Sequence, residues 1–163
     1  MKKYGVVLVL VVVSVAVWVA SASAISKPQV FSLLAIDNGM GQPINGFMFD
    51  RQPVAGDQFP IAENLYKWAG TKKGAPAGHD QGIATFVIVG KSSQTTLFTV
   101  TAYLGGGTIF VNGMGRTTEG NESVTLPIVG GTGKYAGARG YVVHRPLGNG
   151  NGNKSNLEFH LLP

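Results

Sequence analysis

The sequence contains no cysteine, few charged residues and only one long apolar run. Without a thiol the chain cannot form a disulfide, a thiolate zinc site, an iron–sulfur cluster or a cysteine nucleophile. Charged residues make up 13% of the 163 residues, which is too little for an acidic disordered tail or a coiled coil. The formal charge of +5 is a mild positive excess, and we expect no nucleic-acid partner from it.

Glycine, by contrast, is frequent, with 24 residues in the chain against an average usage of about 7%. The glycines follow no collagen-like period, so we interpret them as turn and strand-corner residues. The same composition argues against a bundle of long helices.

The apolar run lies at the N-terminus and has the three parts of a secretory signal. Lys2-Lys3 forms a short basic region, Gly5–Ala20 is uncharged and rich in valine, and Ala22-Ser-Ala24 matches a small-x-small cleavage site. This order of features predicts a signal peptide over residues 1–24.

The alternative to a signal peptide is a membrane anchor, which usually needs about 20 apolar residues. The present run is shorter and ends in serine and alanine instead of a basic flank. We therefore expect cleavage before Ile25, and a mature domain of residues 25–163 with no membrane attachment. This domain is predicted to be secreted and extracellular, in the apoplast if the source is a plant.

Two tripeptides match the acceptor pattern for N-glycosylation. They are Asn121-Glu-Ser123 and Asn153-Lys-Ser155, so Asn121 and Asn153 are the candidate glycosylated residues. The pattern matters only in a eukaryotic secretory pathway, and two asparagines in polar turns explain it equally well.

The remainder of the chain alternates between short β-prone runs and turn residues. Eight runs rich in Val, Ile, Phe, Thr and Tyr are predicted as strands because Gly, Asn, Pro and Ser separate them. They are Val30–Ile36, Ile61–Lys67, Ile83–Val89, Thr95–Leu104, Thr108–Gly115, Ser123–Val129, Arg139–Arg145 and Asn156–Leu162. Eight strands joined by hairpin-length connections suggest an all-β fold, either a closed antiparallel barrel or a sandwich.

The distribution of apolar residues favours the barrel. Ile83–Val89 is largely apolar on both faces, and such a strand must be covered on both sides. A closed barrel meets this demand if its lumen is apolar and its outer wall is buried by neighbouring subunits. An eight-stranded barrel is wide enough for one small ligand, so we expect an eight-stranded antiparallel closed β-barrel with an apolar lumen.

Three motifs resemble known protein families. The run Leu126-Pro-Ile-Val-Gly-Gly-Thr-Gly-Lys-Tyr-Ala-Gly-Ala-Arg-Gly140 resembles the late hairpin of plant dirigent proteins, and Gly78-His-Asp-Gln-Gly82 resembles another dirigent motif. Gly56-Asp-Gln-Phe-Pro-Ile-Ala-Glu-Asn-Leu-Tyr66 is similar to a stretch of allene oxide cyclases. The two families share one eight-stranded barrel, and the late hairpin is the most specific of the three likenesses.

The resemblance to dirigents implies a cofactor-free protein that holds phenoxy radicals, made by a separate oxidase, so that they couple with one stereochemistry. It also implies a homotrimer and an arginine in the lumen, here Arg139, and an aspartate near the pocket, here Asp37. Allene oxide cyclases carry a catalytic glutamate on the first strand, where this chain has Ala35. That departure argues against cyclisation of an allene oxide.

Three residues are therefore candidates for catalysis. Arg139 would pair with a carboxylate or a phenolic oxygen, and strand alternation places Tyr141 on the same face as Arg139. Asp37 in an apolar pocket would have a raised pKa and exchange protons near neutral pH. The alternatives are a structural or solvent-facing arginine, and an aspartate that caps the turn beginning at its own position.

Aromatic and amide residues of the strands are candidates for ligand binding, although each also fits a plain core position. They are Tyr66, Phe98, Tyr103, Phe110 and Asn112. The three histidines are scattered, without the spacing of a metal site, so we predict no metal. The absence of a cofactor is what the resemblance to dirigents implies.

Three functions remain open from the sequence. The leading hypothesis is a dirigent-like protein that binds a small hydrophobic or phenolic molecule and directs radical coupling. The second is a cofactor-free cyclase or isomerase that needs no oxidase. The third is a secreted binding protein without catalysis.

Overall fold

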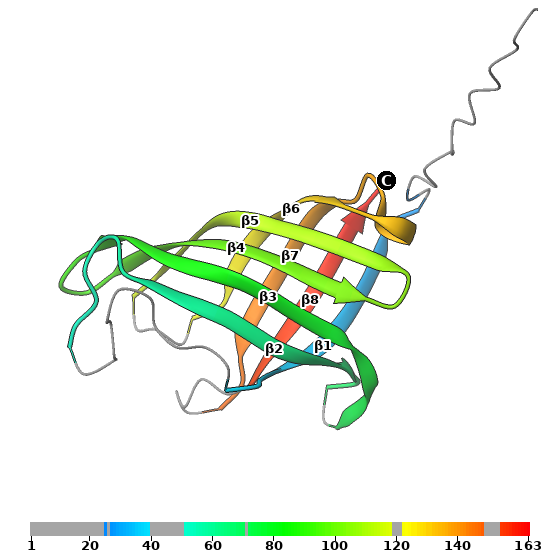
Figure 1. Ribbon diagram of the computed structural model, residues 1–163, viewed down its shortest axis with the longest axis horizontal. Helices are drawn as coiled ribbons and strands as arrows, with labels where there is room; N and C mark the ends of the chain where they lie inside the picture. The colour runs from blue at the N-terminus through cyan, green and yellow to red at the C-terminus, as the bar shows by residue number, and fades with distance from the viewer. Residues whose placement is uncertain (1–24, 26, 40–50, 71, 119–121, 149–153) are drawn as a thin grey trace, which may run out of the picture.

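The computed structural model describes residues 25, 27–39, 51–70, 72–118, 122–148 and 154–163. The predicted signal peptide and both candidate glycosylation residues, Asn121 and Asn153, lie outside the described residues. Within the described part the fold is all-β, and its eight strands form a closed antiparallel barrel (Figure 1). Each strand pairs with the next along the chain, and the last pairs with the first. The predicted barrel is confirmed.

The strand bounds follow the sequence prediction closely, with one exception in β3. The elements are β1 (Gln29–Asp37), β2 (Gln58–Trp68), β3 (Lys73–Val89), β4 (Gln94–Leu104), β5 (Gly107–Thr117), β6 (Val124–Gly131), the short 3-10 turn η1 (Gly133–Tyr135), β7 (Arg139–Pro146) and β8 (Lys154–Leu162). None of the helical structure in the described part is long and apolar enough to cross a bilayer.

β3 begins ten residues earlier than Ile83, where we predicted its start. The added part contains glycine and proline, which are typical of turns, yet it pairs with β2 across two irregularities in register. Gly78 explains one reason for glycine there. A β-carbon at Gly78 would overlap the carbonyl oxygen of Tyr103 on β4, so only glycine allows the two strands to approach so closely.

The lumen is packed solid at one end of the barrel. The largest side chains buried there come from β2, β5 and β8, and the least exposed are Leu65, Ile109, Phe159 and Leu161. Phe31 of β1 stacks on Phe159 with ring centroids 5.0 Å apart. Tyr135 of η1, within the dirigent-like motif, is buried in the same cluster, so this motif helps to close the packed end.

The other end of the barrel is where β2, β4, β6 and β8 begin and where β1, β3, β5 and β7 end. Alternate residues of these strand segments face a cavity instead of a filled core. The two ends therefore share one barrel wall and one pattern of alternation, but among the described residues the cavity lies at this second end.

Candidate functional site

The cavity at the open end has a volume of about 340 Å³. Ligand pockets for small molecules have volumes of about 300–1,000 Å³, so this one is suited to a small ligand. Most of its lining is apolar and includes Phe59, Ile61, Phe86, Phe98, Val100, Val111, Val124, Leu126, Val142, Leu157 and Phe159. A bound molecule would be held mainly by exclusion of water from apolar surface.

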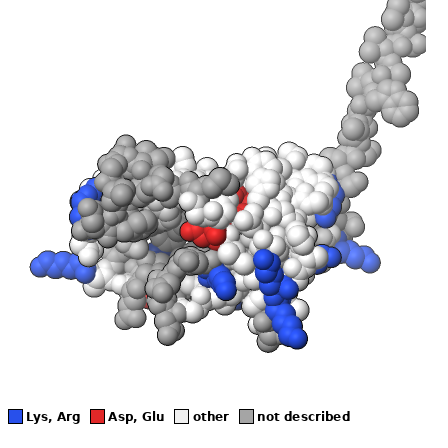
Figure 2. All heavy atoms as spheres, turned by 60° about the horizontal axis from the view of Figure 1, so that its bottom comes forward, with Lys and Arg blue, Asp and Glu red and all other residues white. Residues whose placement is uncertain are grey.

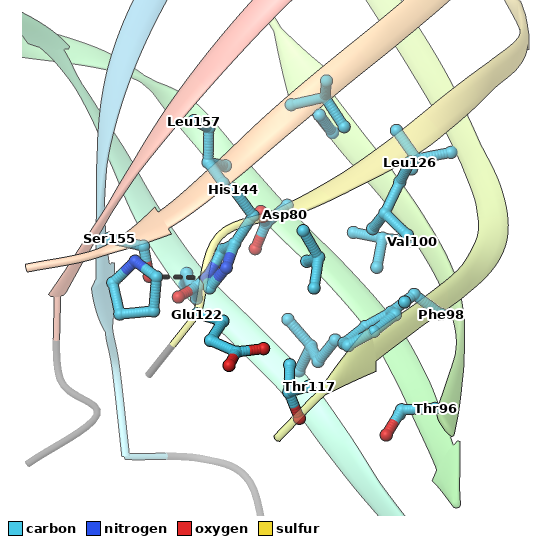
Figure 3. A pocket seen from close by; sticks show the side chains of 18 of the residues that line it. Asp80, Thr96, Phe98, Val100, Thr117, Glu122, Leu126, His144, Ser155 and Leu157 are labelled. Carbon is cyan, nitrogen blue, oxygen red and sulfur yellow. Dashed lines mark hydrogen bonds between the residues drawn. The ribbon is translucent and has the colours of Figure 1, made fainter. Parts of the chain in front are cut away.

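Several polar side chains line the same cavity and gather on one side of it. In Figure 3, Asp80, Glu122, His144 and Ser155 lie opposite Phe98 and Leu126. Glu63 of β2 also lines the cavity. These polar side chains would orient a ligand that itself bears a polar group.

Glu63 and Asp80 form a carboxyl pair across β2 and β3. They are direct partners in the register of the two strands, and Asp80 is 2% exposed. Burial, together with the negative charge of Glu63, raises the pKa of Asp80 to about 8. Burial, with the charge of Asp37 as a smaller cause, raises the pKa of Glu63 to about 7, against the effect of its hydrogen bond with Asp80. The pair therefore holds a proton at neutral pH.

One oxygen of Asp80 is left over by this pairing. The Oδ1 atom is buried and has no hydrogen-bond partner among the described residues. A buried polar atom without a partner costs about 1–3 kcal/mol, and native structures rarely leave one unexplained.

His144 of β7 and Ser155 of β8 form a second polar pair in the lumen. The Nε2 atom of His144 lies 2.9 Å from the Oγ atom of Ser155 (Figure 3). Ser155 is 4% exposed, and burial lowers the pKa of His144 below its ordinary value. The imidazole is therefore neutral at pH 7.

Glu122 has a different environment at the edge of the cavity. Its carboxylate accepts hydrogen bonds from the backbone N–H and the hydroxyl of Thr118. These bonds lower the pKa of Glu122, so its carboxylate is ionised at neutral pH. Glu122 therefore adds a negative charge to the cavity. The Glu63–Asp80 pair beside it keeps a proton, and His144 is neutral.

Phe98 lines the cavity, as we predicted. The other four residues that we predicted to bind a ligand lie on the outer wall, so the prediction that they line the lumen is wrong. On each of these strands the other set of alternate residues faces inward. The ring of Tyr66 lies 3.7 Å below the ammonium group of Lys73. The Tyr103 ring is 4.8 Å from that of His79.

Phe110 and Asn112 of β5 point outward for the same reason. Phe110 is 37% exposed, and the amide of Asn112 donates a hydrogen bond to Thr99 Oγ1 over 3.1 Å. Their inward neighbour on β5 is Val111, which is 5% exposed and lines the cavity.

Arg139 and Tyr141 also lie on the outer wall, so the predicted lumen position of these two residues is wrong. Arg139 is exposed, and its Nε atom donates a hydrogen bond to the carbonyl oxygen of Pro163. Tyr141 stacks on His160 of β8 with ring centroids 4.4 Å apart. The residues of β7 that line the cavity are Val142, His144 and Pro146.

Asp37 lies at the edge of the site without lining the cavity. It is the last residue of β1, and its side chain accepts a hydrogen bond from the backbone N–H of Gly39 over 2.8 Å. This is the turn-capping alternative that the sequence left open. Asp37 is also the cross-strand partner of Glu63, so its charge contributes to the raised pKa of Glu63.

The sequence contained signals for the polar residues that we did not select. On β2, Glu63 lies two positions from both Ile61 and Leu65, so the three side chains share one face. On β3, Asp80 shares a face with Gly82 for the same reason. An acidic residue on the apolar face of a strand must find a special partner. We missed Asp80 because we placed the start of its strand at Ile83.

Charge on the surface is scattered. On the face shown in Figure 2, Lys and Arg side chains are spread over the width of the molecule around a small acidic area. The basic side chains of the described residues form no continuous track on this face of the kind that nucleic-acid backbones bind. Within the described residues, no group of three or more His, Asp or Glu side chains is placed to hold a metal ion.

Comparison with known structures shows the same barrel in proteins of different activities. One is a pyocyanin demethylase, with a TM-score of 0.66 and 21% identity over 82% of this chain and 100% of the other. AbnU, an exo-specific intermolecular Diels-Alderase, has a TM-score of 0.65 and 16% identity over 83% and 96% of the two chains. The pterocarpan synthase dirigent protein GePTS1 has a TM-score of 0.61 and 18% identity over 83% of each chain.

These likenesses establish the fold, while the sequence family comes from a separate comparison. A comparison with curated proteins gave no match. The sequence model of the dirigent-like protein family matches residues 56–162, from the segment before β2 through β8. The match includes every cavity-lining residue described above, and the chain belongs to the dirigent-like family.

Proposed function

We propose that this protein binds a small hydrophobic or phenolic molecule in the barrel lumen and directs its conversion to one stereoisomer. The proposal rests on one observation above all, the Glu63–Asp80 carboxyl pair inside an apolar cavity. A carboxyl group with a pKa near neutrality can give and take protons at physiological pH. The apolar wall around it would exclude water and fix the ligand's orientation.

In the form that we favour, the substrate is a phenoxy radical supplied by a separate oxidase. The lumen holds one such molecule at a time, so that the new bond forms on one face. The carboxyl pair then exchanges a proton with the quinone methide that coupling produces. Membership of the dirigent-like family supports this form. The pterocarpan synthase dirigent protein GePTS1 has a similar barrel.

A second candidate is a cofactor-free cyclase or isomerase that acts without an oxidase. The proton held by the carboxyl pair favours it, because acid catalysis of a cyclisation requires a donor and not a radical source. The barrel of the Diels-Alderase AbnU has a similar fold. Simple binding without turnover is the third possibility.

An experiment with and without an oxidant separates these forms. A panel of phenols such as coniferyl alcohol is incubated with the mature protein, alone and with a one-electron oxidant, and products are separated on a chiral column. An excess of one enantiomer only with oxidant supports radical coupling, and conversion without oxidant supports the isomerase. Racemic products in both arms, with retained phenol binding, leave a binding protein; absence of binding overturns the proposal.

The protein is further proposed to be secreted after removal of residues 1–24 and to form a homotrimer. Apolar side chains on the outer wall support assembly, since Ile88, Met114 and Val129 are 61%, 64% and 61% exposed. A soluble monomer rarely leaves large apolar patches in water. N-terminal sequencing of secreted protein should begin at Ile25, and light scattering should give three times the monomer mass.

A further inference from the structure

The pair formed by His144 and Ser155 has no role in the function proposed above. Both side chains line the cavity, and both are held inside the barrel by the alternation of β7 and β8. Burial of a histidine and a serine is expensive unless they satisfy each other. Their 2.9 Å contact does so for one ring nitrogen and leaves the serine oxygen able to accept another hydrogen bond.

The geometry of the pair matches that of a hydroxyl and its base. In the tautomer with a bare Nε2 atom, the Ser155 hydroxyl donates to His144. Ser155 Oγ then keeps lone pairs that can accept a further hydrogen bond. Asp80 and Glu122 lie on the same side of the cavity (Figure 3), with Glu63 beside Asp80 and Lys154 at the edge.

We propose that Ser155 and His144 form a hydroxyl-binding subsite. In it, Ser155 Oγ accepts a hydrogen bond from the O–H group of the bound molecule, and a proton is relayed from that group through Ser155 to His144. The O–H bond of the ligand breaks as an O–H bond to Ser155 Oγ forms, and the proton of Ser155 moves to Nε2 of His144. The ligand oxygen becomes negative and the His144 imidazole positive; because burial disfavours the charged imidazole, this charged state is transient. No electron is transferred.

This inference rests on the proposed function, and it narrows the substrate class. A molecule that loses a hydroxyl proton to His144 and gains a proton from Asp80 has an unchanged composition. The substrate would therefore be a neutral molecule with an ionisable hydroxyl group and, elsewhere, an atom that accepts a proton. Proton return from the imidazolium to the carboxyl pair, through the ligand site or water at the open end, restores the starting state.

The test uses two probes of nearly equal size, 2-naphthol and naphthalene. Either is small enough for a cavity of about 340 Å³. Burying a hydroxyl without a partner is unfavourable, whereas one hydrogen bond contributes about 0.5–1.5 kcal/mol. We expect the wild type to bind 2-naphthol roughly three- to tenfold more tightly than naphthalene.

Variants assign that preference to particular residues. Ser155→Ala and His144→Gln should bring the ratio of the two dissociation constants to one or below, while naphthalene binding changes little. His79→Gln, a histidine on the exposed outer wall, is the matched control and should keep the ratio. Asp80→Asn is included because it tests the competing assignment of the ligand hydroxyl to the carboxyl pair. Production in a bacterial host avoids any effect of Ser155→Ala on glycosylation, and circular dichroism checks the fold.

The possible outcomes separate the subsite from the proposed function. Loss of the ratio in the Ser155 and His144 variants alone supports the subsite. Loss of the ratio in Asp80→Asn alone assigns the ligand hydroxyl to the carboxyl pair and overturns the subsite. A wild-type ratio of one also overturns the subsite. In both cases the proposal of lumen binding stands. If the wild type binds neither probe, the lumen-binding function fails and the subsite with it.

Discussion

The packed end and the open end of the barrel are built from the same strands but contain different kinds of side chain. At the packed end, Leu65 and Ile109 are completely buried. At the open end, Asp80 is almost as deeply buried, yet it lines a cavity and one of its oxygens has no partner among the described residues. The first arrangement stabilises the fold, whereas the second costs free energy, because a polar atom is buried without a hydrogen bond. A barrel whose stability comes from one end can retain a polar site at the other.

The largest expected effect comes from truncating leucines at the two ends of one strand. Leu161 and Leu157 both point inward from β8, with exposures of 1% and 7%. Leu161→Ala should lower the free energy of unfolding by about 4–5 kcal/mol, because it opens a new void in a packed region. Leu157→Ala should cost only about 2–3 kcal/mol, because it enlarges an existing cavity. Urea denaturation measures both; equal losses would mean that the two ends are packed alike.

The second prediction concerns the pH dependence of stability. The fold raises the pKa of both Asp80 and Glu63, so it binds their protons more tightly than the unfolded chain does. Stability is therefore fully present at low pH for these groups, and is lost as pH rises through their folded-state pKa values. Between about pH 7 and pH 9 we expect a loss on the order of 2 kcal/mol.

The double variant Glu63→Gln/Asp80→Asn should flatten this dependence, since neither amide can ionise. His144 does not interfere in that range, because its lowered pKa affects stability only at acidic pH. Urea titrations of wild type and variant at several pH values provide the measurement. A wild-type stability that is constant over this pH range would show that water solvates the carboxyl pair and that the fold does not raise its pKa values.

A third prediction compares the inner wall with the outer wall at the level of binding. Phe98→Trp adds volume inside the cavity and should weaken binding of naphthalene at least roughly tenfold, or about 1.4 kcal/mol. Arg139→Leu should change it less than about twofold, because Arg139 lies outside the barrel. Fluorescence titration measures both. A strong effect of Arg139→Leu with an intact fold would restore the role that the family resemblance implied for this arginine.

The sequence predicted the barrel well because alternation and turn residues act locally. All eight strands were found, and the inward face of β4 with Phe98 was among the candidates. The inward face of β7 was missed because we chose it from the resemblance at Arg139. The alternation itself favours the other set, since Val142 and its neighbours two residues apart are less polar than Arg139, Tyr141 and Arg145.

The polar site could not be derived in the same way, because it depends on register between strands. Glu63 and Asp80 are 17 positions apart in the sequence and meet only through the pairing of β2 with β3. His144 and Ser155 meet through the pairing of β7 with β8. A period of two identifies the face of each residue, but not which residue of the next strand lies opposite.

The smallest expected effect on stability is on the outer wall, which surrounds both ends. Met114 lies on this wall near the open end, and Val129 lies on β6 towards the packed end; both are largely exposed. Surface substitutions typically change stability by less than about 0.5 kcal/mol, so Met114→Lys and Val129→Lys should leave the unfolding of the isolated barrel almost unchanged. If the outer wall forms the proposed trimer interface, at least one of them should reduce the mass seen by light scattering from trimer to monomer.

The control is Val54→Lys, a substitution of an exposed apolar residue in the segment before β2, and it should leave the mass unchanged. A trimer that survives both wall substitutions would place the interface elsewhere, and a monomeric wild type would mean that the outer wall tolerates water as it stands.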